Sequence, residues 1–437
     1  MMKAELEVCL GAGEMLVGTL QYEAAVQREH SCFRYAQSWL ESHDAFALAP
    51  ALALNDSKFF FQGERPFPSA LMDTLPDSWG EIVLKRQARK ASADQVFNPY
   101  FFLLSVSDFC RCGALRIRHP GGEFLAPGTD GMLPRLLQLH EFCEYVRAVE
   151  AKETKETLET TSLRQFVFAG SSLGGARPKC SVLDDAGELA VAKFTSHNDT
   201  RAVERVEVLT LHLARKCGIS APEVRLLDGP PGLPIALIKR FDRDRRTRIP
   251  YISAQTMLNS QRADDKSYTD IAESIRANGA SPKEDLRELF KRILFTILVS
   301  NVDDHLKNHG FLYAGNNKWR LSPVFDVNPS PDREKKLKTK IADGGDDSAS
   351  IALLLEYAFY FEVEEDEAVK LASEMAGIVK NSWTKLAHEL GMSKADITEF
   401  RPAFEHKETV AAENLTCPRV IVTDGCEEDD NDSGLPT

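Results

Sequence analysis

The feature that most constrains this sequence is a long apolar stripe that runs directly into a polar loop. Over residues 282–300, apolar side chains recur at positions 286, 289, 290, 293, 294, 297 and 298, the spacing of a helix with one broad buried face. Ser281 as N-cap, Pro282 at the first helical position and Glu284 as partner in a capping box predict where this helix begins. The helix is therefore expected in the core, where it delivers the chain to Asn301.

The polar loop reads Asn301-Val-Asp-Asp-His-Leu-Lys-Asn308, and an apolar hairpin separates it from Leu321-Ser-Pro-Val-Phe-Asp326. An Asp, an Asn five positions later and a second Asp match the order of groups in a kinase-type phosphoryl-transfer centre. Asp303 would be the base, Asn308 and Asp326 the Mg²⁺ ligands, and Lys307 would neutralise charge on the transferred group. Such a loop is also typical of a solvated helix end, and the usual His-Arg-Asp and Asp-Phe-Gly letters are replaced.

A second candidate segment is Gly170-Ser-Ser-Leu-Gly-Gly-Ala-Arg-Pro-Lys179. Its small residues allow backbone N–H groups to approach phosphate oxygens closely. It matches neither the GxxxxGK[ST] nor the GxGxxG pattern, and a glycine-rich turn between strands is often only a turn. Its place upstream of a strand that carries a lysine favours a loop that covers phosphates.

That strand lysine is Lys193, within Leu189-Ala-Val-Ala-Lys-Phe194. A charge in an apolar strand needs a partner, and Glu207 or Glu204 on the following helix could provide one. The pattern then predicts a contact with the α- and β-phosphates of a nucleotide. A lysine on the exposed face of a strand is the plainer alternative.

The segment Leu237-Ile-Lys-Arg-Phe-Asp242 is an apolar strand that ends in charges. If it joins two lobes, the backbone of Lys239 and Phe241 can hydrogen-bond adenine, and Asp242 can reach the ribose. An edge strand with a charged end is the alternative. His305 and His309 do not have the HExxH spacing of a metal hydrolase.

Composition narrows the class of protein. The chain of 437 residues has a net charge of −13, with 43% hydrophobic and 27% charged residues, as in an ordinary globular protein. The negative charge argues against strong unaided binding to DNA or to an anionic membrane. We see neither a secretion signal nor an apolar run long enough to span a membrane, and nine cysteines without a CxxC pair predict reduced thiols. A cytoplasmic protein is expected.

Changes in pattern along the chain predict its organisation. Strand-like pieces surround one helix at 203–216, and separate helices are expected at 365–379 and 381–391. The predicted segments are a β-rich N-terminal subdomain with a helix (1–125), a helix and polar linker (126–161), a small lobe (162–242), a mainly helical large lobe with the polar loop (243–412), and an acidic disordered tail (413–437).

Taken together, these segments resemble the HipA family of bacterial serine/threonine kinases, the toxins of type II toxin–antitoxin pairs. The similarity covers most of the chain and rests on six motifs in order. They are Leu75-Pro-Asp-Ser-Trp-Gly80, Asp108-Phe-Cys-Arg-Cys-Gly-Ala-Leu115, Ser172-Leu-Gly-Gly-Ala-Arg-Pro-Lys179, Lys193, Lys239-Arg-Phe-Asp242, and the loop Asn301–Asn308 with Phe325-Asp326.

The resemblance implies an α+β fold, kinase-like and two-lobed, with an extra N-terminal β-rich subdomain. It implies ATP and Mg²⁺ as cofactors, and autophosphorylation of Ser172 that inactivates the protein. Asp304 stands where the family commonly has Arg, which would change the charge near the γ-phosphate. The resemblance assigns nucleotide binding to Gly174, Gly175, Ala176, Arg177, Pro178, Lys179, Lys193, Lys239, Phe241, Asp242, His305, Asn308 and Phe325.

The family also implies partners. It predicts a cytosolic protein substrate, in translation for well-known members, and a small helix-turn-helix antitoxin through which the chain would reach DNA. Two alternatives stay open: an ATP-binding pseudokinase that acts as corepressor with the antitoxin, and a small-molecule kinase of the same fold.

Overall fold

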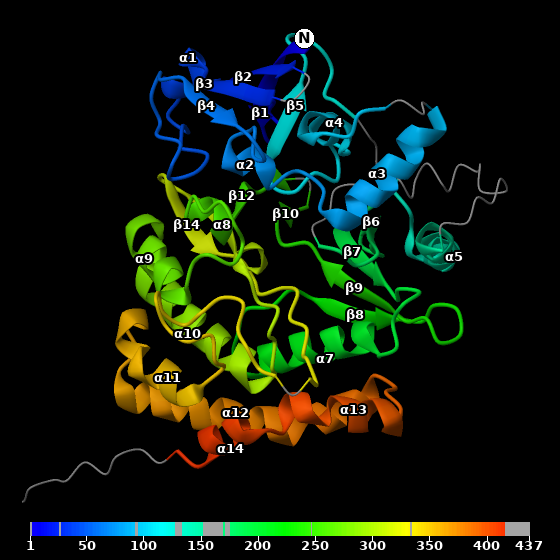
Figure 1. Cartoon of the computed structure of the whole chain (residues 1–437), viewed down its shortest axis with the longest axis vertical. Helices are drawn as coiled ribbons and strands as arrows, with labels where there is room; N and C mark the ends of the chain where they lie inside the picture. The colour runs from blue at the N-terminus through cyan, green and yellow to red at the C-terminus, as the bar shows by residue number, and fades with distance from the viewer. Residues whose placement is uncertain are drawn as a thin grey trace, which may run out of the picture.

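The two larger sheets of the chain, with five and four antiparallel strands, stand over a helical base (Figure 1). The computed structural model describes residues 2–25, 28–91, 95–126, 133–151, 169–170, 175–245, 247–332 and 334–415. The expected linker at 152–161 and all but the first residues of the expected acidic tail lie outside these ranges.

The N-terminal sheet has five strands in the order β4-β3-β2-β1-β5. Residues on alternate positions of β1, such as Leu6 and Val8, are buried, the two-residue period of a sheet with one packed face. The elements of this region are β1 (Met2–Leu10), β2 (Met15–Ala25), β3 (Arg28–Tyr35), α1 (Gln37–Leu40), β4 (Phe59–Gln62), α2 (Ser69–Met72), α3 (Ser78–Ala91), α4 (Pro99–Ser105) and β5 (Leu115–Arg118).

The second sheet has four strands in the order β6-β7-β9-β8. The helix expected at 203–216 is α7, with those bounds. The elements are β6 (Lys179–Leu183), β7 (Leu189–Phe194), α7 (Val203–Lys216), β8 (Val224–Leu227) and β9 (Ile235–Lys239). Every residue of β6 is buried, because the helices α3 and α5 (Leu139–Glu150) contribute to one apolar cluster with this sheet. A short 3₁₀ turn, η2 (Leu136–Gln138), precedes α5.

The lower half of the molecule is mainly helical, and α10 (Pro282–Leu298) runs through its core. Strands β12 to β14 form a small sheet above these helices, against the N-terminal region, where Phe46 stacks on Tyr313 at 3.8 Å between ring centroids. The remaining elements are β10 (Arg243–Asp244), β11 (Thr247–Arg248), β12 (Tyr251–Ser253), α8 (Ala254–Met257), α9 (Tyr268–Asn278), η4 (Leu306–Asn308), β13 (Gly310–Gly315), β14 (Lys318–Leu321), α11 (Ile351–Glu356), η5 (Ala358–Phe361), α12 (Glu365–Glu389), α13 (Lys394–Phe404) and α14 (Lys407–Glu413).

Two local expectations were wrong. Ser281 is the N-cap of α10 and Pro282 its first residue, as expected, but the predicted capping box is absent, and the Ser281 hydroxyl instead accepts from Arg320 at 3.1 Å. The helices expected at 365–379 and 381–391 are the single helix α12. Val379 and Trp383 are both buried on one side of it, so packing carries the helix through the weakly helix-forming pair Asn381-Ser382.

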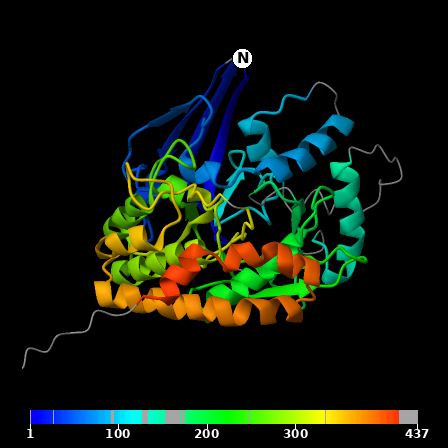
Figure 2. The ribbon, with the colours of Figure 1, turned by 60° about the horizontal axis from the view of Figure 1, so that its bottom comes forward.

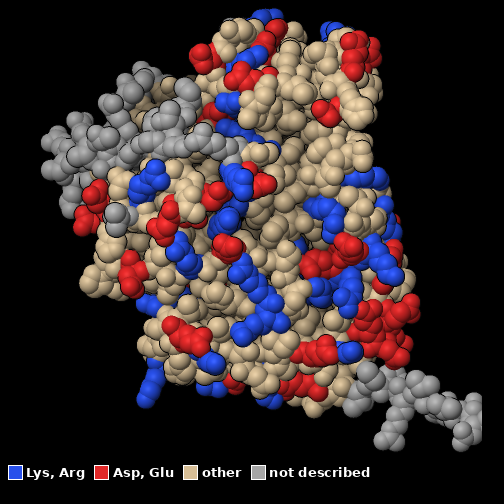
Figure 3. Space-filling model, turned by 180° about the vertical axis from the view of Figure 1, so that it is seen from behind, with Lys and Arg blue, Asp and Glu red and all other residues tan. Residues whose placement is uncertain are grey.

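The C-terminal helices α12, α13 and α14 cover the side of the molecule away from the N-terminal sheet (Figures 1 and 2). On the face opposite to that of Figure 1, acidic and basic side chains are interspersed (Figure 3). Within the described ranges, no helix is both long and apolar enough to cross a bilayer.

Candidate active site

The polar loop lies where the sequence places it, directly after α10. The chain leaves the helix through Ser300, which has a φ of 55° and donates a hydrogen bond to the carbonyl of Ala403 at 3.0 Å. Asn301 then holds the later segment in place, because its side-chain oxygen accepts from the N–H of Asn328 at 3.2 Å. The buried helix therefore fixes both the loop and the segment that carries Asp326.

Lys193 joins three elements that are distant in sequence. Its amine lies 2.5 Å from Glu207 Oε1 on α7 and 2.7 Å from Asp326 Oδ1. Lys193 and Glu207 are 7% and 1% exposed, so the lysine is not a surface residue of β7. Of the two candidate partners, Glu204 pairs instead with Arg177 at 2.7 Å.

The electrostatics of this cluster keep Asp326 ionised. Burial disfavours its charge, but Lys193 and then Lys179 outweigh burial and hold the pKa of Asp326 well below its usual range. Burial likewise opposes a charged Lys193, yet Asp326 and Glu207 hold the pKa of this lysine above its ordinary value. Asp326 has a φ of 57°, a left-handed conformation that is uncommon for a non-glycine residue and often marks a functional site.

Lys179 is a second buried cation beside the first. Its amine packs against Gly175, where a side chain would not fit: a Cβ on this glycine would lie only 2.6 Å from the amine nitrogen. Gly175 also has a φ of 91°. Burial and the neighbouring charge of Lys193 lower the pKa of Lys179 to about 8. A cation held under a glycine with this backbone conformation fits the predicted phosphate loop.

The rest of the predicted phosphate loop is only partly described. Ala176 and Pro178 follow Gly175 toward β6, and Arg177 is bound to Asp199 and Glu204. Gly174 and Ser172 lie outside the described residues, so both assignments stay predictions.

Asp303 is exposed on the polar loop and pairs with Lys338. Asn308 is buried, and its amide nitrogen donates to the backbone oxygen of Asp303 at 3.4 Å. Lys307, which the sequence predicts to neutralise charge on the transferred group, pairs with Asp77 at 2.9 Å.

The motif places Asp304 near the γ-phosphate, but the structure directs its side chain into the core. It is 5% exposed, and its carboxylate accepts from Tyr268 at 2.5 Å and lies 3.1 Å from His309 Nε2. Through its bond with Tyr268, the carboxylate anchors the loop to α9. The neighbouring His305 is half-buried, and its Nδ1 has no hydrogen-bond partner among the described residues.

Asp77 is a site residue that sequence reasoning missed. Its two carboxylate oxygens accept from the N–H of Gly175 at 2.6 Å and from Lys307 at 2.9 Å. It thus ties the phosphate loop to the polar loop from within the N-terminal region. Asp77 belongs to the Leu75–Gly80 motif, which supported the family resemblance, but the sequence analysis gave this residue no role in the site.

The predicted hinge follows β9. The N–H of Lys239 donates to the carbonyl of Glu223 at 2.9 Å, and the ring of Phe241 lies 5.4 Å from that of Phe325. The predicted hinge therefore meets the segment that carries Asp326.

The carboxylate of Asp242 is occupied by protein groups and is not available to a ribose. It is 3% exposed and accepts from Arg240, Arg243 and the N–H of Gly113, at distances of 2.6 to 2.8 Å. The two arginines, after the opposing effect of burial, hold its pKa well below the usual range. This geometry does not support the predicted ribose contact, and it instead binds the hinge to the motif at 108–115.

The oxygen donors present fit Mg²⁺. Asp326 offers an ionised carboxylate and Asn308 an amide oxygen, and Mg²⁺ is commonly held by one or two protein oxygens together with phosphates and water. Among the described residues, no group of three or more His, Cys, Asp or Glu side chains is placed to hold a metal. A site completed by a bound triphosphate is consistent with this donor set.

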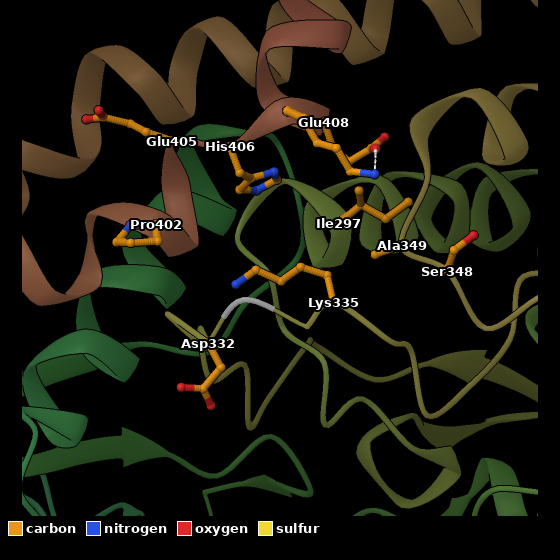
Figure 4. A pocket seen from close by; sticks show the side chains of 10 residues that line it. Ile297, Asp332, Lys335, Ser348, Ala349, Pro402, Glu405, His406 and Glu408 are labelled. Atoms are coloured by element: carbon orange, nitrogen blue, oxygen red, sulfur yellow. Dashed lines mark ion pairs between the residues drawn. The ribbon is translucent and has the colours of Figure 1, made fainter.

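A cavity of about 340 Å³ lies between the segment that follows Asp326 and the C-terminal helices (Figure 4). Asp332 and Lys335 of that segment face His406 and Pro402 from the C-terminal helices across it.

Two family profiles match the chain. The HipA N-terminal domain matches residues 6–118, and the HipA-like C-terminal domain matches residues 171–383. The chain belongs to the HipA family. The HipA domains account for both the N-terminal sheet and the two lobes that hold the site.

Among curated relatives, "Putative kinase Y4mE" of Sinorhizobium fredii is 24% identical over 336 residues, which are 71% of this chain and 75% of that protein. A "Putative kinase" of Haemophilus influenzae is 30% identical over 109 residues, 22% of this chain. That match and one to another Sinorhizobium fredii protein each span 32% of the relative's length.

The HipA fold is also seen in a solved structure. The HipA chain from the Shewanella oneidensis complex of HipA, HipB and operator DNA superposes with a TM-score of 0.64 at 15% identity, over 93% of this chain and 96% of that one. The expected α+β, kinase-like fold with an extra N-terminal β-rich subdomain is thereby confirmed.

Proposed function

We propose that this chain is an ATP- and Mg²⁺-dependent protein serine/threonine kinase that acts in the cytoplasm as the toxin of a toxin–antitoxin pair. The observation that carries the proposal is the double contact of Lys193 with Glu207 and Asp326. A lysine paired with a helix glutamate beside the metal-binding Asp is the arrangement that orders a triphosphate in a kinase.

The residues divide the work as follows. ATP, when bound with Mg²⁺, supplies the γ-phosphoryl group, and ADP leaves with the electron pair of the broken bond. Lys193 and Lys179 would neutralise phosphate charge, and Asp326 and Asn308 would hold the metal. Asp303 orients the acceptor hydroxyl and takes its proton as the hydroxyl oxygen bonds to phosphorus.

The burial of Asp304 weakens the pseudokinase alternative. The reason to entertain it was a negative charge next to the γ-phosphate. Because the Asp304 carboxylate is buried and hydrogen-bonded to Tyr268 and His309, it is held in the core by these partners.

The proposed partners follow the HipA–HipB pair. The Shewanella oneidensis protein is in complex with HipB and operator DNA, and we propose an antitoxin of the same kind here. The net charge of −13 suits an arrangement in which the antitoxin contacts the DNA. The substrate would be a cytosolic protein, and Ser172 the autophosphorylation site.

The test is incubation of purified wild type and Asp303→Ala with Mg²⁺ and ATP, followed by intact mass and peptide mapping. Phosphate gain in the wild type alone supports the kinase. If neither protein gains phosphate, alone or with a bacterial lysate freed of its own kinases, although both bind ATP, the pseudokinase alternative stands. Induced expression of the two variants then tests toxicity, which only the active protein should show.

A further inference from the structure

The basic run Glu334-Lys-Lys-Leu-Lys-Thr-Lys340 follows Asp326 and is fixed along the polar loop. Leu337, Thr339 and Ile341 are buried, and the lysines between them, Lys338 and Lys340, are exposed. The chain bends at Lys338 and Thr339, and the buried side chains on either side hold it against the protein. The lysines are exposed, as in a solvated loop, but the buried residues between them hold the segment in place.

Backbone hydrogen bonds hold this segment against the loop on both sides of Asp303. The N–H of Lys338 donates to the carbonyl of Val302 at 3.4 Å, and the N–H and hydroxyl of Thr339 donate to the carbonyl of Asp304 at 3.1 and 2.9 Å. On the far side, the carbonyl of Lys340 accepts from the N–H of Tyr268 at 2.9 Å. The position of the Lys338 backbone beside Asp303 is thus determined by its neighbours.

The side chain of Lys338 reaches the carboxylate of Asp303 from this position, and the two form an ion pair. The cation within the loop itself, Lys307, is bound to Asp77. Lys338 also helps to lower the pKa of Asp264, but that carboxylate is held mainly by Arg262 at 3.0 Å. Lys338 is therefore the cation that Asp303 contacts, although it lies 35 positions away in sequence.

We infer that Lys338 is a positioning residue for catalysis, which holds the Asp303 carboxylate toward the acceptor hydroxyl. The inference rests on the proposed kinase function and places Lys338 as the cation beside the base, a role that the sequence did not suggest. In this role the ammonium group restrains one carboxylate oxygen and leaves the other for the hydroxyl proton. Lys307 instead keeps the phosphate loop in place through Asp77.

A purely structural role does not fit the exposure of the pair. The side chains of Lys338 and Asp303 are 53% and 63% exposed, and ion pairs in such surroundings add little to stability. The buried residues and backbone bonds of the segment already fix it. Replacement of Lys338 should therefore change the rate and leave the fold intact.

The experiment compares Lys338→Met, Lys338→Arg and the control Lys336→Met with the wild type. Lys336 lies on the same segment and pairs with Glu334, away from Asp303. We expect Lys338→Met to lower kcat about tenfold or more, because a misplaced base loses much of its effect. KM for ATP, ATP affinity by calorimetry and Tm should remain at wild-type values. Lys338→Arg should restore most of the rate, and Lys336→Met should match the wild type.

A second comparison separates orientation of Asp303 from other effects of the charge. In an Asp303→Ala background, Lys338→Met should reduce the residual rate no further, since the residue it orients is gone. A full additional loss in that background, or unchanged kcat in the single variant, would overturn the inference. If the wild type itself transfers no phosphate, the proposed function fails instead, and the two failures are thereby distinct.

Discussion

Lys193 donates a hydrogen bond of 2.7 Å to Asp326, a residue 133 positions later in the chain. The bond joins β7 of the small lobe to the segment that follows β14 in the large lobe. Lys193 also contacts Glu207 on α7. Both contacts form only when the two lobes and α7 are correctly placed relative to one another. Nucleotide binding should therefore depend on all three side chains together.

The Lys193 cluster gives the first prediction. Lys193→Met leaves Glu207 and Asp326 as buried carboxylates without their shared cation, so we expect the loss of phosphate transfer by about a hundredfold or more and a lower Tm. The thermal shift with Mg²⁺ and ATP should disappear. Glu207→Gln keeps a hydrogen-bonding oxygen and should lose less of both quantities. Equal losses in the two variants would show that charge on Glu207 matters as much as the lysine.

Lys179 predicts a pH dependence of nucleotide affinity. Its pKa of about 8 in the free protein means that the amine is charged below pH 8, and a bound phosphate would favour that charged form. Affinity should be flat below pH 8 and fall by up to about tenfold per pH unit above it, as the free protein must take up a proton to bind. Calorimetry of ATP binding between pH 6.5 and 9.5 measures the profile.

The control for that profile is Lys179→Met, which cannot titrate. Its affinity should be low and independent of pH through the same range. Lys193 should not contribute, because its two carboxylate partners raise its pKa. A wild-type profile without a bend near pH 8 would contradict the role given to Lys179.

Asp77 predicts an effect of the N-terminal region on the site. Asp77→Asn removes the charge that Lys307 pairs with and weakens the bond from the Gly175 N–H. We expect a KM for ATP that rises about fivefold to tenfold, the loss of one charge-assisted hydrogen bond, with a smaller change in kcat. Glu81→Gln on α3, which breaks a surface pair with Lys85, is the matched control. A change confined to kcat would instead place Asp77 at the reacting groups.

Asp242 predicts a change in stability. Asp242→Ala leaves Arg240 and Arg243 buried without their shared carboxylate and removes the acceptor of the Gly113 N–H. Breaking a buried ion pair in this way costs about 3–5 kcal/mol of unfolding free energy, which denaturant unfolding followed by tryptophan fluorescence can measure. Asp185→Ala, which removes an exposed partner of Arg225, should change stability little. If Asp242→Ala unfolded at the same denaturant concentration as the wild type, the stabilising role of Asp242 would be contradicted, and the predicted ribose contact would again be open.

Local patterns in the sequence were sufficient for most of the elements. The strands at 179–183 and 189–194 and the helix at 203–216 follow from runs of apolar residues with periods of two and 3.6, because those periods are set by backbone geometry. The apolar stripe of α10 likewise determined that the polar loop would follow a buried helix. The pairing of Lys193 with Glu207 was one of two options, and helix geometry alone could not choose between Glu204 and Glu207.

The failures share one physical cause. Asp304 and Asp242 look like site carboxylates in sequence, yet each is buried among cations or hydroxyl groups from distant segments. Whether a charged side chain faces a ligand or a buried partner depends on what packs against it, and a linear pattern does not contain this information. The same holds for Ser281, because its hydroxyl accepts a hydrogen bond from Arg320 and does not cap the helix.

The sequence by itself determined the elements, the order of the candidate groups and the resemblance to the HipA family, since these depend on local periodicity and spacing. Only the tertiary structure decided which charges meet. Asp77 reaches Gly175 and Lys307, and Lys338 reaches Asp303, because long-range packing brings together segments that local patterns leave unconnected. The electrostatic energies of the site depend on those distances and on burial, which the fold alone sets.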